Sequence, residues 1–142
     1  MNTQKTISPV DGSVYCEREL ATDAAVDAAL TQASEAQARW RLTPVAEHAR
    51  ICNAFCERFE AEATGIATEL TWQMGRPIRY APNEVRGTLE RARHMIAIAA
   101  DALADIDVGP KDGFHRFLRR ESLGVVFTIA AWNYPYLSPS TA

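Results

Sequence analysis

Apolar residues recur at helical spacing through the middle of this chain, which predicts four helices. The first follows Thr22, a suitable N-cap, and its mostly apolar stripe consists of Val26, Leu30, Ala33, Gln37 and Trp40. The second is expected to use Thr43 as its cap and to bury Ile51, Cys52, Phe55 and Phe59. Gly65 marks the expected break before a third helix, which ends at Gly75. The fourth is expected to run from about residue 81 to residue 104.

Strands are expected near both ends of the chain. The dipeptide Asp11-Gly12 favours a tight turn because glycine accepts a positive φ, so residues 8–15 predict a hairpin whose second strand continues through 16–20. Beyond the loop at 109–113, strands are predicted at 114–121 and 124–130. The strand from Phe114 to Glu121 is rich in arginine, as expected of an exposed edge or an intersubunit contact. The strand at 124–130 is continuously apolar, as in a sheet buried on both faces.

This order of elements predicts an incomplete domain. A strand buried on both faces needs neighbouring strands, and too few strands follow residues 124–130 to supply them. We therefore expect three segments. Residues 8–113 form the hairpin and helices, residues 114–122 form an oligomerisation strand, and residues 123–137 form the start of a further sheet.

Composition excludes several classes of function. The net charge of −3 argues against a nucleic-acid partner, which usually binds a basic surface. No apolar run approaches the roughly 18 residues of a membrane span, and the polar N-terminus lacks a signal-peptide pattern, so we expect a cytoplasmic protein with no membrane partner. Cys16, Cys52 and Cys56 form no disulfide or ligand pattern, and no metal site is expected.

Several motifs occur in a recognisable order. They are SPVDGSV at 8–14, TELTWQMGRP at 68–77, EV at 84–85, RESLGVV at 120–126 and WNYP at 132–135. Together they resemble the N-terminal part of the NAD(P)-dependent aldehyde dehydrogenase superfamily, over residues 8 to about 137 and roughly the first third of such an enzyme. The resemblance implies an α/β fold, of which this chain is an incomplete, helix-rich cofactor-binding portion with an N-terminal hairpin and C-terminal strands.

The resemblance also implies roles for particular residues. In the family a cysteine thiolate attacks the aldehyde, and the residue matching Asn133 donates its side-chain N–H to the resulting oxyanion. The residues matching Ile129, Ala130 and Trp132 line the nicotinamide side of the cleft that binds NAD or NADP. The implied substrate is a small aldehyde, and the implied assembly is a homo-oligomer.

Two other interpretations remain open at this point. Without the resemblance, Asn133 would be interpreted as an ordinary turn residue whose side chain bonds to nearby backbone. The chain as a whole suits a non-catalytic helical interaction module that pairs with another chain through strand 114–121.

The sequence departs from the family pattern in ways that bear on activity. Ala131 and Arg76 replace the usual proline and lysine, and residues 138–142 do not match the helix that the family has there. All three cysteines precede Asn133, whereas the family nucleophile follows it, and no general-base glutamate stands at a matching position. We therefore expect a truncated piece that is inactive by itself.

Overall fold

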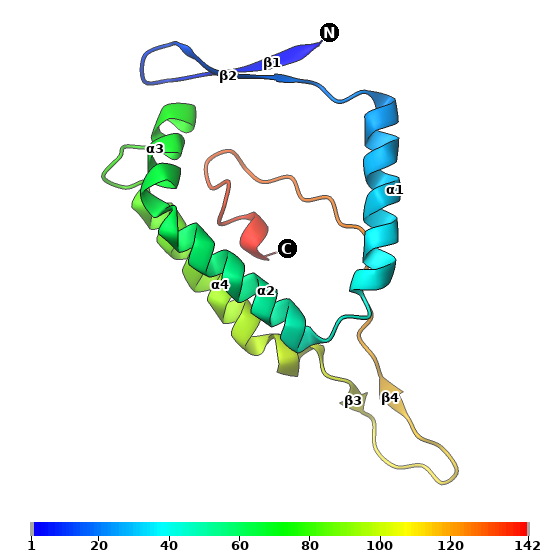
Figure 1. Cartoon of the computed structure of the whole chain (residues 1–142). Helices are drawn as coiled ribbons and strands as arrows, with labels where there is room; N and C mark the ends of the chain where they lie inside the picture. Colours follow the sequence, from blue (N-terminus) through cyan, green and yellow to red (C-terminus); the bar gives the residue numbers. More distant parts are fainter. Residues whose placement is uncertain (1, 142) are drawn as a thin grey trace.

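The computed structural model describes residues 2–141 and is built mainly of helices (Figure 1). Its longer elements are the hairpin strands β1 (Thr3–Ile7) and β2 (Val14–Glu19) and the helices α1 (Asp23–Trp40), α2 (Val45–Ala61), α3 (Ala63–Met74) and α4 (Pro82–Leu103). Its shorter elements are the strands β3 (Ile106–Asp107) and β4 (Phe117–Leu118) and the 3-10 turn η1 (Pro139–Thr141). Among the described residues, no helix is both long and apolar enough to cross a membrane.

Antiparallel β1 and β2 form the predicted hairpin, with a register irregularity between Thr6 and Ile7. The predicted turn is confirmed: Gly12 has a φ of 76°, and the Ser13 N–H donates to the Asp11 carboxylate at 2.9 Å. That hydrogen bond lowers the pKa of Asp11. The first strand, however, lies before Ser8 rather than after it. The mostly polar residues 3–7 form a strand because their backbone groups pair with those of β2. The periodicity of their side chains did not predict this strand.

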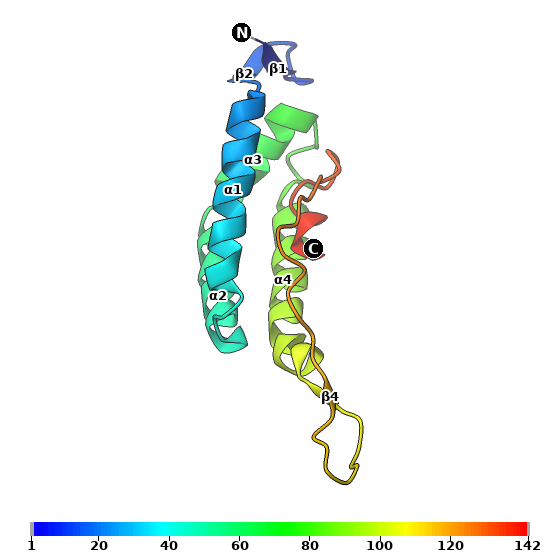
Figure 2. The same ribbon diagram turned by 90° about the vertical axis from the view of Figure 1, so that its right-hand side faces the viewer.

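Helices α2, α3 and α4 form the core of the molecule, with α2 and α4 side by side in two views (Figures 1 and 2). One cluster of buried side chains joins α2 to α4 and consists of Cys56, Phe59, Val85 and Leu89. A second cluster joins α3 to the segment before α4 and consists of Ala67, Leu70 and Ala81. The predicted face of α2 is therefore correct at Phe59, whereas Ile51, Cys52 and Phe55 are exposed and Cys56, which was not assigned to that face, is buried.

The helix boundaries test the predicted caps. The Ala25 N–H donates to the Thr22 side chain at 3.2 Å, which confirms that cap. Gly75 follows α3 in the left-handed region with a φ of 79°, which confirms that stop signal. The predicted Thr43 cap is wrong, because Pro44 occupies the cap position of α2 and no side chain bonds there. The break between α2 and α3 falls at Glu62, and Gly65 lies inside α3.

Helix α1 stands apart from the core (Figure 1). It has no buried residue, and the predicted stripe leaves Val26, Leu30 and Trp40 exposed. Contacts with Ser122 and His48 tie it to the rest of the chain. The Gln37 side chain donates to the Ser122 hydroxyl at 2.8 Å, and the Trp40 ring stacks on His48 with centroids 4.2 Å apart.

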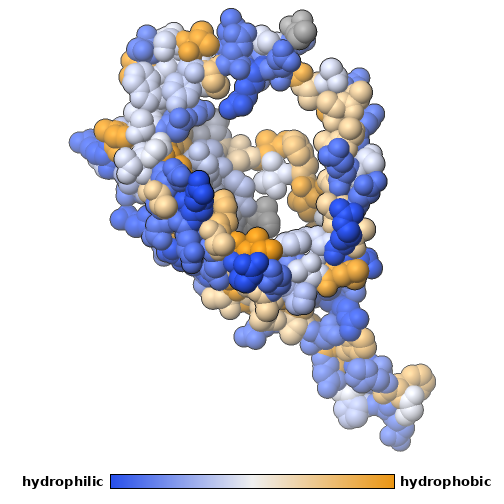
Figure 3. All heavy atoms as spheres, in the orientation of Figure 1, coloured by the Kyte–Doolittle hydropathy of each residue, from blue (hydrophilic) through white to orange (hydrophobic). Residues whose placement is uncertain are grey.

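The predicted C-terminal strands need the largest correction. Of the segment 114–121, only β4 is a regular strand, and it pairs with β3, a partner that the sequence pattern did not indicate. Residues 124–130 form no strand, because among the described residues none pairs with them. We call residues 123–132 the strap. Its apolar side chains lie exposed in the hollow between α1 and the core (Figure 3).

Candidate functional site

The strap leads into a folded turn that carries the motif WNYP. The Tyr134 N–H donates to the Ala131 carbonyl at 3.2 Å, which closes a turn with Trp132 and Asn133 at its centre. The Ser138 N–H donates to the Tyr134 carbonyl at 3.1 Å, so the chain curls a second time before η1. We call residues 133–137 the motif turn.

The four residues predicted to form the site follow one another along this path. Asn133 is exposed, as are Trp132 and Ile129, whereas Ala130 is half-buried. The Asn133 amide is therefore accessible to a ligand and is not enclosed in a core. Its position in the turn also matches the plainer interpretation of a turn residue.

The same residues can be tested against a nicotinamide cofactor. Ile129 is 82% exposed and Trp132 is 76% exposed, so the segment that leads to Asn133 presents an apolar and accessible wall. Such a wall suits the flat, weakly polar face of a nicotinamide ring. The residues present therefore fit one side of a cofactor cleft.

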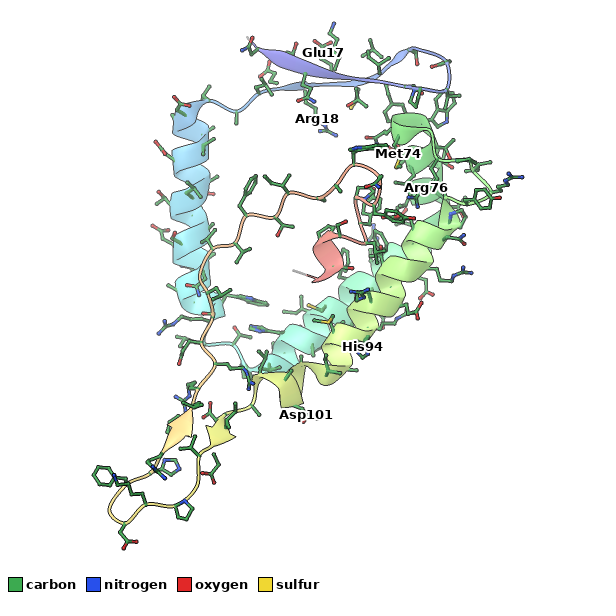
Figure 4. All side chains as sticks on the ribbon, turned by 180° about the vertical axis from the view of Figure 1, so that it is seen from behind. Glu17, Arg18, Met74, Arg76, His94 and Asp101 are labelled. Carbon is green, nitrogen blue, oxygen red and sulfur yellow. The ribbon has the colours of Figure 1, made fainter. Side chains whose placement is uncertain are left out.

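A buried ion pair holds the motif turn against the helices. The Glu84 carboxylate, at the start of α4, accepts from Arg76 Nη1 at 2.8 Å through Oε2. Its Oε1 accepts from the backbone N–H groups of Tyr136 at 3.2 Å and Leu137 at 3.1 Å. Arg76 Nη2 also donates to the backbone carbonyl of Asn133. Arg76 is labelled in Figure 4, just beyond the end of α3.

Sequence reasoning missed this pair as part of the site. From the sequence, Arg76 is only a replacement for the usual lysine, and Glu84 is only part of a motif. One signal could have found Glu84. It lies on the face of α4 that also carries Ala81, Val85 and Thr88, so it places a carboxylate in a stripe of buried positions.

Tyr136 joins the motif turn to the core. Its side chain packs against both buried clusters, and its ring meets Phe59 edge to face with centroids 5.3 Å apart. Burial raises the pKa of Tyr136, and the nearby charges of Glu69 and Glu84 raise it further. The contacts of the Tyr136 side chain are therefore with the core.

A pocket of about 300 Å³ lies beside the motif turn. Its walls come from β1, α3, the strap and the motif turn: Thr6, Glu69, Leu70, Gln73, Met74, Trp132, Pro135 and Tyr136. Most of this lining is apolar. The motif therefore borders a cavity as well as the open surface around Asn133.

The cysteines and histidines contribute nothing to this site in the part of the chain that the structure describes. Cys56 is buried in the α2–α4 cluster, Cys52 is exposed, and no group of three or more His, Cys, Asp or Glu residues between positions 2 and 141 could hold a metal ion. Burial raises the pKa of the Cys56 thiol, which lowers its reactivity. His48 contacts Trp40 at the α1–α2 junction.

These features describe a class of protein: an α/β portion with an exposed amide and an apolar wall, carried by a strap and a turn that packs against helices. The model of the aldehyde dehydrogenase family matches residues 1–142, and the chain belongs to that family. The fold of the whole class is α/β, as predicted, and its solved members share the arrangement described here.

Individual relatives give the same result. The chain is 33% identical over 133 residues to succinate-semialdehyde dehydrogenase [NADP(+)] of Mycobacterium avium, which covers 92% of this chain and 28% of that protein. A putative aldehyde dehydrogenase from Burkholderia cenocepacia superposes with a TM-score of 0.89 at 31% identity, over 98% of this chain and 28% of that one. PnpE in complex with nicotinamide adenine dinucleotide superposes with a TM-score of 0.89 at 28% identity, over 98% and 28% of the two chains. The chain thus spans less than a third of the length of the relatives that it matches.

Proposed function

We propose that this chain supplies the oxyanion-binding turn and one cofactor-binding wall of an enzyme that oxidises an aldehyde to a carboxylic acid with NAD⁺ or NADP⁺. Family membership supports the aldehyde chemistry. The relatives' names and the NAD- and NADP-bound neighbours support the cofactor. The residue assignment rests on one observation: Asn133 is exposed at the centre of a turn that an ion pair holds in place.

In this proposal Asn133 acts on the substrate oxygen. When a thiolate adds to an aldehyde, the carbonyl oxygen becomes an oxyanion that needs preorganised hydrogen-bond donors. The side-chain NH₂ of Asn133 is one such donor. Removing a donor of this kind costs about 2.7–4 kcal/mol of transition-state stabilisation.

The strap has a different role. The nicotinamide, when bound, supplies the hydride acceptor. Ile129, Ala130 and Trp132 line one side of it and exclude water there, because their side chains are apolar and open to a ligand.

We further propose that the chain alone does not catalyse the reaction. The family nucleophile would follow Asn133, but Cys16, Cys52 and Cys56 all precede it. The buried Cys56, with its raised thiol pKa, also has the wrong environment for a nucleophile. An oxyanion donor without a nucleophile can bind but cannot react.

Two measurements test the proposal. The purified chain, mixed with NAD⁺ or NADP⁺ and aldehydes that include succinate semialdehyde, is expected to produce no NADH or NADPH. A chimera that joins residues 1–137 to the remainder of the Mycobacterium avium relative is expected to produce it. In that chimera Asn133→Ala should lower kcat about 10²–10³-fold.

Asn53→Ala is the matched control, because Asn53 is an exposed asparagine on α2 and the chemical change is the same. It should leave kcat unchanged. Turnover by the chain alone would refute its proposed inactivity. A folded chimera without activity, or an Asn133→Ala chimera at full activity, would refute the assignment of the motif.

A cytoplasmic location and a homo-oligomeric assembly remain parts of the proposal. The three cysteines are free, which fits a reducing compartment. Assembly would use the ribbon from Phe114 to Glu121, which projects away from the helices with Phe114 and Leu118 exposed. One edge of this ribbon is already occupied, since β4 pairs with β3.

A further inference from the structure

Glu84 is the most deeply buried charged residue of the core, and its side chain has no exposed surface. Its two carboxylate oxygens accept hydrogen bonds from different donors. Oε2 accepts from Arg76, and Oε1 accepts from two successive backbone N–H groups, those of Tyr136 and Leu137. An ionised carboxylate is suited to accept three donors at once, whereas a neutral amide would place its own N–H groups against one of them.

Arg76 connects Glu84 to Asn133, the proposed oxyanion donor. Its side chain is 13% exposed, and Nη2 donates to the main-chain carbonyl of Asn133. The guanidinium also lies over the Tyr134 ring, 4.5 Å from the centroid. The two side chains thus contact four residues of the motif turn, namely Asn133, Tyr134, Tyr136 and Leu137.

These contacts differ in kind from a stabilising surface ion pair. Burying two charges costs desolvation free energy, and an apolar pair of similar volume would serve packing as well. The polar pair supplies directed hydrogen bonds that apolar side chains cannot make, and three of them end on the backbone of the motif turn. The pair is neutral as a unit, so it fixes the backbone without adding net charge beside the Asn133 amide.

We propose that Arg76 and Glu84 are positioning residues that clamp the backbone of residues 133–137 so that the Asn133 side-chain amide points to a fixed place. The clamp occupies the main-chain carbonyl of Asn133 and leaves its amide group free to donate. This inference rests on the proposed function for the meaning of the fixed amide. The effect of the two side chains on the backbone of residues 133–137 does not depend on that function.

The chain contains a matched pair for comparison. Arg93 of α4 donates to the Glu60 carboxylate of α2 at 2.6 Å, but the side chains are 48% and 57% exposed. That pair joins two helices at the surface and makes no contact with the motif turn in the hydrogen bonds of the described residues. Replacing Arg93 removes the same chemical group without touching the clamp.

The test is amide hydrogen exchange, followed by NMR, on the whole chain and its variants Arg76→Met, Arg76→Lys, Glu84→Gln and Arg93→Met. In Glu84→Gln, exchange at Tyr136 and Leu137 should rise at least about tenfold relative to the amides of α2, because a hydrogen bond to a charged acceptor contributes that factor or more. In Arg76→Met, exchange at the same two amides should rise as well, because the Glu84 carboxylate loses the partner that holds it in place. Arg76→Lys retains a charged donor and should restore most of the protection. Arg93→Met should leave the motif turn unchanged.

Each outcome decides the matter. Unchanged exchange at Tyr136 and Leu137 in Arg76→Met would overturn the proposal, and so would an equal rise at every core amide, since that is loss of stability alone. If Arg76→Met does not fold, Glu84→Gln decides, because it replaces the charged acceptor of the Tyr136 and Leu137 N–H groups, and unchanged exchange at these two amides would overturn the proposal. The measurement contains no aldehyde or cofactor, so a failed clamp leaves the proposed chemistry standing, and an inactive chimera leaves the clamp standing.

Discussion

The strap and the motif turn are adjacent and similarly apolar, yet they have opposite environments. The motif turn places Tyr136 among buried side chains of three helices and ties its backbone to Glu84. The strap exposes Leu123, Phe127 and Ile129 almost fully, and the hydrogen bond from Gln37 to Ser122 ties to α1 the residue just before it. Apolar composition therefore does not decide burial here. A segment is packed where this chain supplies partners for both its side chains and its backbone.

The largest expected effect separates two phenylalanines. Phe59→Ala should destabilise the chain by about 3–5 kcal/mol, because it leaves a cavity beneath Tyr136 and beside Leu89. Phe127→Ala should change the free energy of unfolding by no more than about 0.5 kcal/mol, because Phe127 is 85% exposed. Urea unfolding followed by circular dichroism measures both. Equal losses would show that the strap is packed in solution and would remove the contrast.

A smaller effect separates two glycines. Gly75→Ala should cost about 1–2 kcal/mol because Gly75 has a φ of 79°, and a Cβ there would lie 2.9 Å from Pro9 Cγ of the hairpin turn. Gly65→Ala should instead stabilise the chain by about 0.5–1 kcal/mol, because Gly65 is inside α3 with open space around it. Thermal melts of the two variants give the comparison. A stabilising Gly75→Ala would mean that the hairpin does not rest on the end of α3.

The smallest effect separates two cysteines. Burial raises the pKa of the Cys56 thiol above its ordinary value of 9.0, whereas Cys52, one helical turn earlier, is exposed. At pH 8 iodoacetamide should therefore label Cys52 at least about tenfold faster than Cys56, as read by peptide mass spectrometry.

The sign of the pH dependence follows from the same shift. Because the folded pKa is raised, the neutral thiol is favoured in the folded state. Its contribution to stability is full below pH 9.0 and is lost as the pH rises through the folded value. Labelling of Cys56 should increase in that alkaline range. Equal labelling of both cysteines at pH 8 would contradict the buried position of Cys56.

Local signals in the sequence were sufficient for much of the fold. Thr22 and Gly75 mark helix ends through their own backbone preferences, and the Asp11-Gly12 turn forms by contacts within a few residues. The α4 helix was predicted to within about one residue at each end, because its apolar stripe is long and regular.

The errors arise where the outcome depends on distant partners. Residues 124–130 read as a buried strand, but a strand requires neighbours that periodicity in one segment does not report. The sequence pattern predicted Ile51 and Val26 as core positions. Both are exposed, because in the described part of the chain no element packs over them. The roles of Arg76 and Glu84 depend on a contact across 52 and 53 positions to Tyr136 and Leu137, which no local pattern encodes.

The double contact of Tyr136 with both buried clusters has a consequence for folding order. Helices α2, α3 and α4 are complete by Leu103, but the ring that contacts both clusters is synthesised well after them. During translation the three helices would therefore keep the side of Phe59 that meets Tyr136 uncovered until the later segment leaves the ribosome. A nascent chain halted between these points should be bound by chaperones that recognise uncovered aromatic surface, and release should coincide with the emergence of Tyr136.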